Sequence, residues 1–200
     1  MTHARIGGWA VVLVLGGLAA VSCRKPDYSP LKNNQEWRFA GISELNVNEM
    51  PEPESLAYAI AVTGSAIQPG LGRVYEVGVT RNEEPYLSLF VRKAKDAVFL
   101  LPASHLDGLE PTSGRVKLLE LPLREDAHWD GDDEHSVSFR VLTREDIEIP
   151  AGRFRNCFCV LVDAPRPYGF AFWLAPGAGV VRWSRSFSRV RFELTERVRR

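Results

Sequence analysis

The chain has 200 residues, of which 45% are hydrophobic, so it is long enough to bury a core in one domain. Its 25 basic and 25 acidic residues balance, which argues against a dedicated nucleic-acid-binding protein, whose affinity comes from an excess of Lys and Arg. Aromatic residues make up 10% of the chain, which argues against a disordered protein.

Residues 1–22 are predicted to be a cleaved signal peptide. Arg5 lies in the head, and the apolar run over 9–21 is about thirteen residues long, shorter than the roughly 20 that cross a membrane. The end of the segment, AAVSC, resembles a bacterial lipobox, which implies that Cys23 is the lipidated first residue of the mature protein. Arg24 follows it, and in bacteria that sort lipoproteins by this position the resemblance implies the outer membrane. The alternative is ordinary secretory cleavage with Cys23 incidental.

Residues 23–35 then form a lipidated N-terminus and a flexible tether, because the segment is polar and contains two prolines. A single domain is predicted over 36–200. The stretch 51–62 is compatible with one short helix or with a strand from about Leu56. Short strand-like runs separated by turn residues follow, which predicts an all-β domain of antiparallel hairpins. These runs are 56–64, 72–80, 85–92, 97–102, 114–122, 135–142, 146–150, 153–163, 168–175, 179–183 and 189–194.

Two of these runs are apolar on both faces. Along 168–175 the aromatic residues alternate with Ala171, Trp173 and Ala175, and along 156–162 the two cysteines alternate with Phe158 and Val160. A sheet that leaves one face in water does not show this pattern. The pattern predicts a strongly curved antiparallel sheet, a half-barrel, whose concave face is either packed shut or filled by a ligand.

Three motifs carry a family resemblance. They are LPLREDAHWDG at 121–131, EIPAGRFRNCFCVLV at 148–162 and FWLAPGAGVVRW at 172–183. In this order they resemble elements of the secreted bacterial proteins grouped as TapB-like or as an uncharacterised periplasmic family. The resemblance implies a half-barrel similar in outline to the LolA and LolB lipoprotein carriers. Glu125 and Asp126 stand where the pattern has Gly, and Leu174 stands where an aromatic residue is usual.

The same motifs predict turns and core residues rather than chemistry. Pro150 cannot donate to a strand ladder and Gly152 tolerates positive φ, so Pro-Ala-Gly is predicted to be a tight turn. Cys157 and Cys159 leave one face of a strand with Cα atoms about 6.6 Å apart, at the outer edge of disulfide geometry. Two buried thiols are therefore predicted instead of a disulfide, and a strained bridge is the alternative.

No enzymatic signature, metal site or cofactor motif is predicted. The serines lie in no nucleophile elbow, and no phosphate-binding glycine loop is present in the sequence. An acidic loop could hold a cation, but its spacing fits no known metal motif, and a solvated hairpin loop is the simpler interpretation. Its titratable residues are His128, Asp130, Asp132, Asp133, Glu134 and His135.

The sequence therefore predicts a non-enzymatic lipoprotein of the bacterial envelope, anchored in the outer membrane and facing the periplasm or the cell surface. One hypothesis is that it binds a hydrophobic ligand through Tyr168, Phe170 and Phe172 on the concave face. The alternative is an accessory protein that contacts an envelope partner through its surface. The arginine-rich run over 182–200 is either a contact for anionic lipid or an acidic partner, or a solvated edge. No nucleic-acid partner is expected.

Overall fold

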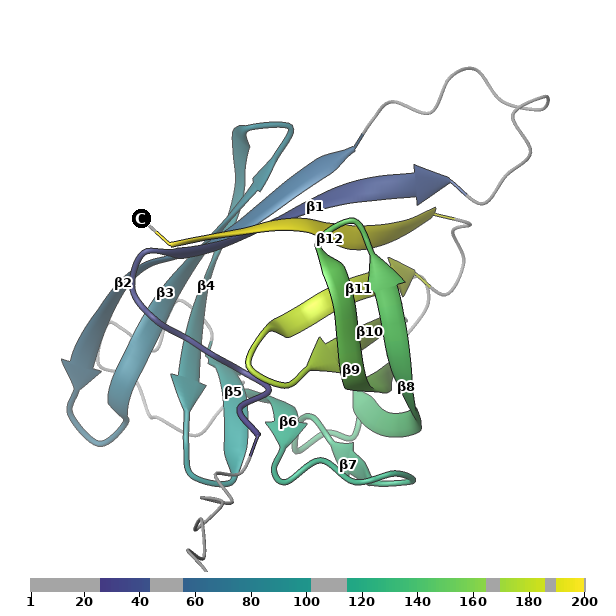
Figure 1. Cartoon of the computed structure of the whole chain (residues 1–200). Helices are drawn as coiled ribbons and strands as arrows, with labels where there is room; N and C mark the ends of the chain where they lie inside the picture. Colours follow the sequence, from purple (N-terminus) through teal and green to yellow (C-terminus); the bar gives the residue numbers. More distant parts are fainter. Residues whose placement is uncertain (1–25, 44–55, 102–114, 165–169, 186–189, 200) are drawn as a thin grey trace, which may run out of the picture.

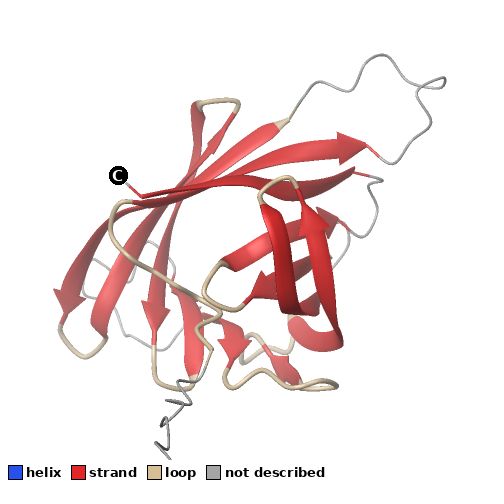
Figure 2. Cartoon of the chain, viewed as in Figure 1, coloured by secondary structure: helices blue, strands red, loops and turns tan. Residues whose placement is uncertain are grey.

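The computed structural model describes residues 26–43, 56–101, 115–164, 170–185 and 190–199, and these residues contain strands and no helix (Figures 1 and 2). The all-β prediction is confirmed, and the stretch that was compatible with a helix is a strand from Ala57 onward. The strands are β1 (Gln35–Ser43), β2 (Ala57–Gln68), β3 (Gly72–Arg81), β4 (Glu84–Lys93), β5 (Ala97–Leu101), β6 (Val116–Glu120), β7 (His128–Asp130), β8 (Ser138–Ile149), β9 (Gly152–Asp163), β10 (Phe170–Ala175), β11 (Gly179–Arg185) and β12 (Val190–Arg199).

All strands belong to one 12-stranded antiparallel sheet, ordered β6-β5-β4-β3-β2-β1-β12-β11-β10-β9-β8-β7. Each strand pairs with its neighbours in the chain, and β1 also pairs with β12. The exceptions are β6 and β7, which are consecutive in the chain but form the two edges of the sheet. Two hydrogen bonds bridge these two edges: the Lys117 amide donates to the Gly131 carbonyl at 2.6 Å, and Trp129 Nε1 donates to the Lys117 carbonyl at 3.1 Å. We call this junction the seam. The sheet is therefore curved more strongly than a half-barrel and nearly closes into a barrel.

The strands after the seam curl tightly, as Figure 1 shows for β8 to β11. The β8–β9 turn reaches β12, where the Ala151 amide donates to the Leu194 carbonyl at 3.0 Å. This curl gives the second half of β9 protein on both faces, so Cys157, Phe158, Cys159 and Val160 are all buried. The prediction that this run has no water-facing side is confirmed, and the reason is the curvature of the sheet.

The segment 26–34 crosses the barrel instead of extending as a tether (Figure 1). Tyr28 is buried, with its ring edge-on to Phe158 at a centroid distance of 5.5 Å. The Asp27 carbonyl accepts a hydrogen bond from the Gly177 amide at 2.7 Å, and the Asp27 carboxylate contacts Lys93 Nζ at 2.6 Å. Residues 26–35 therefore belong to the packed domain, contrary to the predicted flexible tether, because Tyr28 finds an apolar site inside the barrel. The signal peptide and Cys23 lie outside the described residues.

The predicted turn at Pro-Ala-Gly is confirmed. β8 ends at Ile149, β9 begins at Gly152, and Gly152 has a φ of 121°. This φ is one that side-chain-bearing residues rarely adopt. The turn thus requires glycine for its backbone conformation, since no atom within 4 Å would meet an added Cβ.

Substitution of Gly152 should therefore destabilise the fold through the backbone alone. Gly152→Val is expected to lower the free energy of unfolding by about 1–3 kcal/mol. Chemical denaturation measures this, with Arg155→Val as the control, because Arg155 is exposed on the same strand and is not among the residues with positive φ. Equal midpoints for the two variants would show that the turn assignment is wrong.

Candidate ligand site at the barrel mouth

One end of the barrel carries a cluster of aromatic rings, and we call this end the mouth. The Trp183 ring on β11 stacks on Phe192 of β12 at a centroid distance of 4.0 Å. Tyr58, at the start of β2, meets both rings edge-on, at 5.1 Å from Phe192 and 5.5 Å from Trp183. Tyr86 of β4 packs edge-on against Tyr58 at 6.0 Å. Two early strands, β2 and β4, and two late strands, β11 and β12, thus place their aromatic side chains together, in geometries that aromatic pairs prefer.

The β3–β4 hairpin positions the outermost ring of this cluster. Asn82 and Glu83 both have positive φ, which is the type I′ geometry that matches the twist of a two-residue hairpin. The register shifts so that Thr80 lies opposite Pro85 and Val79 opposite Leu87, which leaves Tyr86 as the extra residue of a bulge. The bulge turns Tyr86 toward Tyr58.

Exposure falls from the hairpin toward the interior. Tyr86 is 51% and Leu87 41% exposed, whereas Tyr58 is 8% and Phe192 4% exposed. A hollow of about 290 Å³ lies beside the hairpin. Its lining residues are Gly78, Val79, Thr80, Pro85, Tyr86, Leu87 and Ser88. The arrangement is an apolar surface that starts in solvent and continues into the core.

The predicted ligand residues lie next to this cluster, on β10. Phe172 is buried in the core and pairs across strands with Trp183, and Phe170 is partly buried with its ring 5.9 Å from that of Phe172. Tyr168 lies outside the described residues. The structure therefore joins the β10 aromatics to the mouth cluster, while the side chains that solvent reaches are those of β4. The sequence signal for these was the apolar pair Tyr86-Leu87, which follows the Asn-Glu turn after Glu84 and Pro85.

The opposite face of β10 is covered by charged side chains rather than by a ligand. Trp173 Nε1 donates to a carboxylate oxygen of Glu145 at 2.7 Å. The Arg182 guanidinium lies 5.5 Å from the centre of the Trp173 ring. Both faces of this strand are thus occupied by the protein's own groups.

The two cysteine thiols are free and buried. The pKa of Cys157 and of Cys159 is raised to about 11, chiefly by burial. Nearby carboxylates contribute to this rise, Asp146 and Glu145 at Cys157 and Glu145 at Cys159. A thiol with so high a pKa is protonated at neutral pH and is a poor nucleophile or metal ligand.

Because their pKa values are raised, the thiols should resist modification in the folded protein. At pH 8, Ellman's reagent is expected to react with Cys157 and Cys159 only on the timescale of unfolding, and rapidly after denaturation. The stability that the buried neutral thiols contribute is present below pH 9 and is lost as the pH rises toward 11. The single variants Cys157→Ser and Cys159→Ser assign the two reactions. Rapid labelling of both thiols in the folded chain would contradict the expectation.

The acidic loop lies at the seam, beside a second hollow of about 570 Å³. Its lining residues are Phe99, Arg115, Lys117, Glu120, His128, Trp129, Asp130, Gly131, Asp132, Asp133 and His135. The Ser136 hydroxyl and amide donate to Asp132, and the first of these bonds is the main cause of its lowered pKa. His135 Nδ1 lies 2.8 Å from Asp130. Asp130 and Asp132 thus contact other residues of the same loop. In the described ranges, no set of three or more His, Cys, Asp or Glu is arranged to hold a metal ion.

The arginine-rich run is partly neutralised inside the sheet. The buried Glu193 carboxylate contacts Arg182 at 2.8 Å and Arg191 at 3.2 Å. Arg197 donates to the Gly177 carbonyl at 3.0 Å. These three arginines therefore stabilise the fold, because they form ion pairs and a hydrogen bond within the chain.

The fold and the mouth define a single-sheet β-barrel with an apolar opening at one end. No protein-family model matches the chain, and no curated protein matches it. A solved structure from Parabacteroides distasonis, classed provisionally as a lipoprotein, is similar in fold with a TM-score of 0.51. It shares 12% sequence identity, and the alignment covers 88% of this chain and 100% of that chain. At this identity the likeness concerns the fold alone. The resemblance to TapB-like proteins and to the LolA and LolB carriers stays a prediction.

Among the described residues there is no helix of the length and apolarity that spanning a membrane requires.

Proposed function

We propose that this chain is a lipid-anchored, non-enzymatic protein of the bacterial envelope that binds an apolar ligand at the mouth of its barrel. The observation that carries the proposal is the exposure of Tyr86 and Leu87 in continuity with the buried Tyr58 and Phe192 rings. Contiguous apolar side chains that are exposed to water are typical of ligand-binding and interaction sites. A fatty acid or phospholipid chain fits this chemistry.

The anchor and the location rest on the N-terminal sequence. The lipobox-like AAVSC supports lipidation of Cys23, and Arg24 after it supports the outer membrane. The fold shared with a protein classed provisionally as a lipoprotein supports the lipid anchor alone. The proposal assigns no catalytic role, because burial holds the two thiols protonated and Asp132 of the acidic loop accepts hydrogen bonds from Ser136 in the same turn.

A second candidate is an accessory protein that contacts an envelope partner through the same exposed residues. It is favoured by the filling of the barrel: Phe172 is 8% and Tyr28 6% exposed, and Val160 has no exposed surface. In this case Tyr86 and Leu87 would meet a protein surface instead of a lipid chain.

A binding titration separates the two candidates. The folded chain, stripped of bound lipid, is titrated with the fluorescent apolar probe ANS, and the bound probe is then displaced with a fatty acid. Saturable, displaceable binding is expected, and Leu87→Arg is expected to weaken it at least tenfold with an unchanged circular dichroism spectrum. The matched control is Ile67→Arg, since Ile67 is 67% exposed but lies at the far end of β2. Binding that is absent, or lost equally in both variants, would favour the accessory protein.

A further inference from the structure

We infer that the end of the barrel opposite the mouth lies against the lipid bilayer, so that the mouth faces away from the membrane that holds the protein. This end, which we call the base, consists of the β4–β5 turn, the β6–β7 connection and the β10–β11 turn. The inference rests on the proposed lipidation of Cys23 and adds to it the surface that the membrane contacts.

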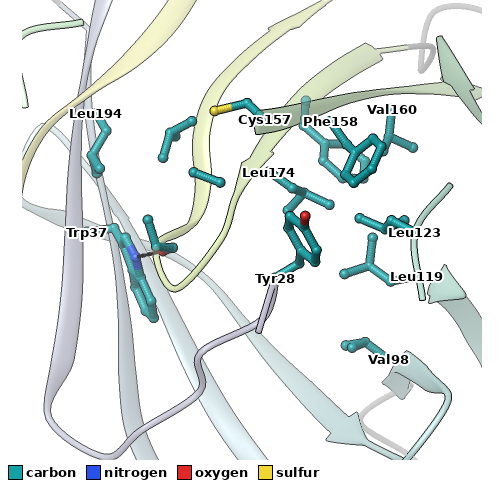
Figure 3. Packing of buried hydrophobic residues seen from close by; sticks show 14 of the residues in the cluster. Tyr28, Trp37, Val98, Leu119, Leu123, Cys157, Phe158, Val160, Leu174 and Leu194 are labelled. Atoms are coloured by element: carbon teal, nitrogen blue, oxygen red, sulfur yellow. Dashed lines mark hydrogen bonds between the residues drawn. The ribbon is translucent and has the colours of Figure 1, made fainter. Parts of the chain in front are cut away.

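Asp27, four positions after the predicted anchor Cys23, is already bound to the base. The Asp27 carbonyl is bound by the Gly177 amide of the β10–β11 turn at 2.7 Å. Lys93, at the end of β4, contacts the Asp27 carboxylate at 2.6 Å and the Ser29 carbonyl at 2.9 Å. Tyr28 between them points into the core, toward Leu119, Leu123 and Leu174 (Figure 3). The position of Asp27 is therefore set by backbone, charge and packing together.

The short distance in sequence from Cys23 limits how far the base can lie from the lipid. A fully extended chain covers about 3.3–3.6 Å per residue, so Pro26 lies within about 10 Å of Cys23. A flexible tether over 23–35 would have allowed about 40 Å, enough for the domain to rotate freely. Because Cys23 must lie at the membrane surface when lipidated, the base is held at the lipid headgroups.

The surface of the base suits headgroups rather than hydrocarbon. The turns expose Lys95, Asp96, Arg124, Glu125 and Asp126. The Leu121 amide donates to the Asp96 carbonyl at 2.7 Å, which ties the β6–β7 connection to the β4–β5 turn. Charged turns cannot enter the hydrocarbon of a bilayer, but they are compatible with its polar interface. The base therefore rests on the membrane without inserting into it.

The mouth follows as the face that is directed to the aqueous compartment. β4 runs from Glu84, beside the mouth, to Lys93 at the base, and ten residues of strand cover about 33 Å. Figure 1 shows the same separation, with the β3–β4 hairpin at the top of the view and the start of the segment 26–34 at the bottom. A ligand would therefore reach the mouth from the compartment or from a partner, and not directly from the anchoring membrane.

Site-specific quenching tests this orientation in the lipidated full-length protein. A fluorophore is attached to Lys95→Cys at the base or to Arg81→Cys near the mouth, and the protein is reconstituted in vesicles whose phospholipid headgroups carry a nitroxide quencher. The base label is expected to be quenched at least threefold more than the mouth label. Inserting twelve Gly and Ser residues between Lys25 and Pro26 is expected to remove most of this difference.

The outcomes separate the anchor from the orientation. Vesicle-bound protein with equal quenching of the two labels, or with stronger quenching at Arg81→Cys, overturns the orientation and leaves the lipidation of Cys23 intact. Protein without an acyl label that does not float with vesicles overturns the lipidation and the orientation with it. Cys23→Ser provides the reference for the unlipidated chain.

Discussion

Tyr28→Ala should lower the free energy of unfolding by about 3–5 kcal/mol, the usual range for removing a large buried aromatic side chain. Tyr28 is 6% exposed, belongs to the main apolar cluster and packs edge-on against Phe158 at 5.5 Å (Figure 3). Truncation would leave a cavity between the two parts of the barrel that the segment 26–34 connects. Chemical denaturation of the folded chain measures the loss.

The control variants are in the same segment. Tyr28→Phe keeps the ring and is expected to cost less than about 1.5 kcal/mol. Lys32→Ala replaces an exposed residue and is expected to change stability by less than about 0.5 kcal/mol. If Tyr28→Ala were as stable as Lys32→Ala, the segment would be a tether after all, and the fixed position of Asp27 would lose its support.

The second large effect is expected at Gly131, where the seam closes. A Cβ at this position would lie 2.6 Å from Phe139 Cε2 and 3.1 Å from the Val137 carbonyl oxygen. The Gly131 carbonyl also accepts the Lys117 amide across the seam at 2.6 Å. Any side chain must displace Phe139, whose ring stacks on Trp129 at 5.4 Å. Gly131→Val is therefore expected to lower the free energy of unfolding by about 3–4 kcal/mol, from overpacking and a weakened backbone bond.

Gly64 offers the comparison, because neither it nor Gly131 is among the glycines with positive φ. An added Cβ there would meet only the flexible end of Glu76, at 3.6 Å, so Gly64→Ala should be close to neutral. Hydrogen exchange at the Lys117 amide reports the seam directly and should accelerate in Gly131→Val alone. Unchanged stability and exchange in Gly131→Val would mean that β6 and β7 do not meet as described.

Most strands could be predicted from alternation and turn residues, and the exceptions have physical causes. β1 was missed because polar residues interrupt its apolar pattern: Gln35 and Glu36 are buried, and Glu36 pairs with Arg38 at 2.7 Å. β7 has three residues, too few to show a period. β8 was divided in two because bulges at Val141/Thr143 and Glu145/Ile147 break the alternation.

The candidate site was harder to predict than the strands, because accessibility depends on how the sheet closes. The sequence showed that β10 is apolar on both faces, but only the curl of β8 to β12 buries Phe172 and leaves Leu87 in solvent. Tyr58 meets the rings of Trp183 and Phe192 because β1 pairs with both β2 and β12, which brings together residues more than a hundred positions apart. The segment 26–34 was predicted to be a tether because it is polar and contains two prolines, and this pattern did not indicate that Tyr28 is a core residue.

The most direct test of the proposed function is to identify the apolar molecules that copurify with the protein from its native host. Native mass spectrometry of the folded chain, followed by extraction and lipid mass spectrometry, should find about one apolar ligand per chain. The ligand should be retained by Ile67→Arg and lost from Leu87→Arg. A folded chain that carries no apolar molecule, or variants that retain the same amount of it, would contradict ligand binding at the mouth.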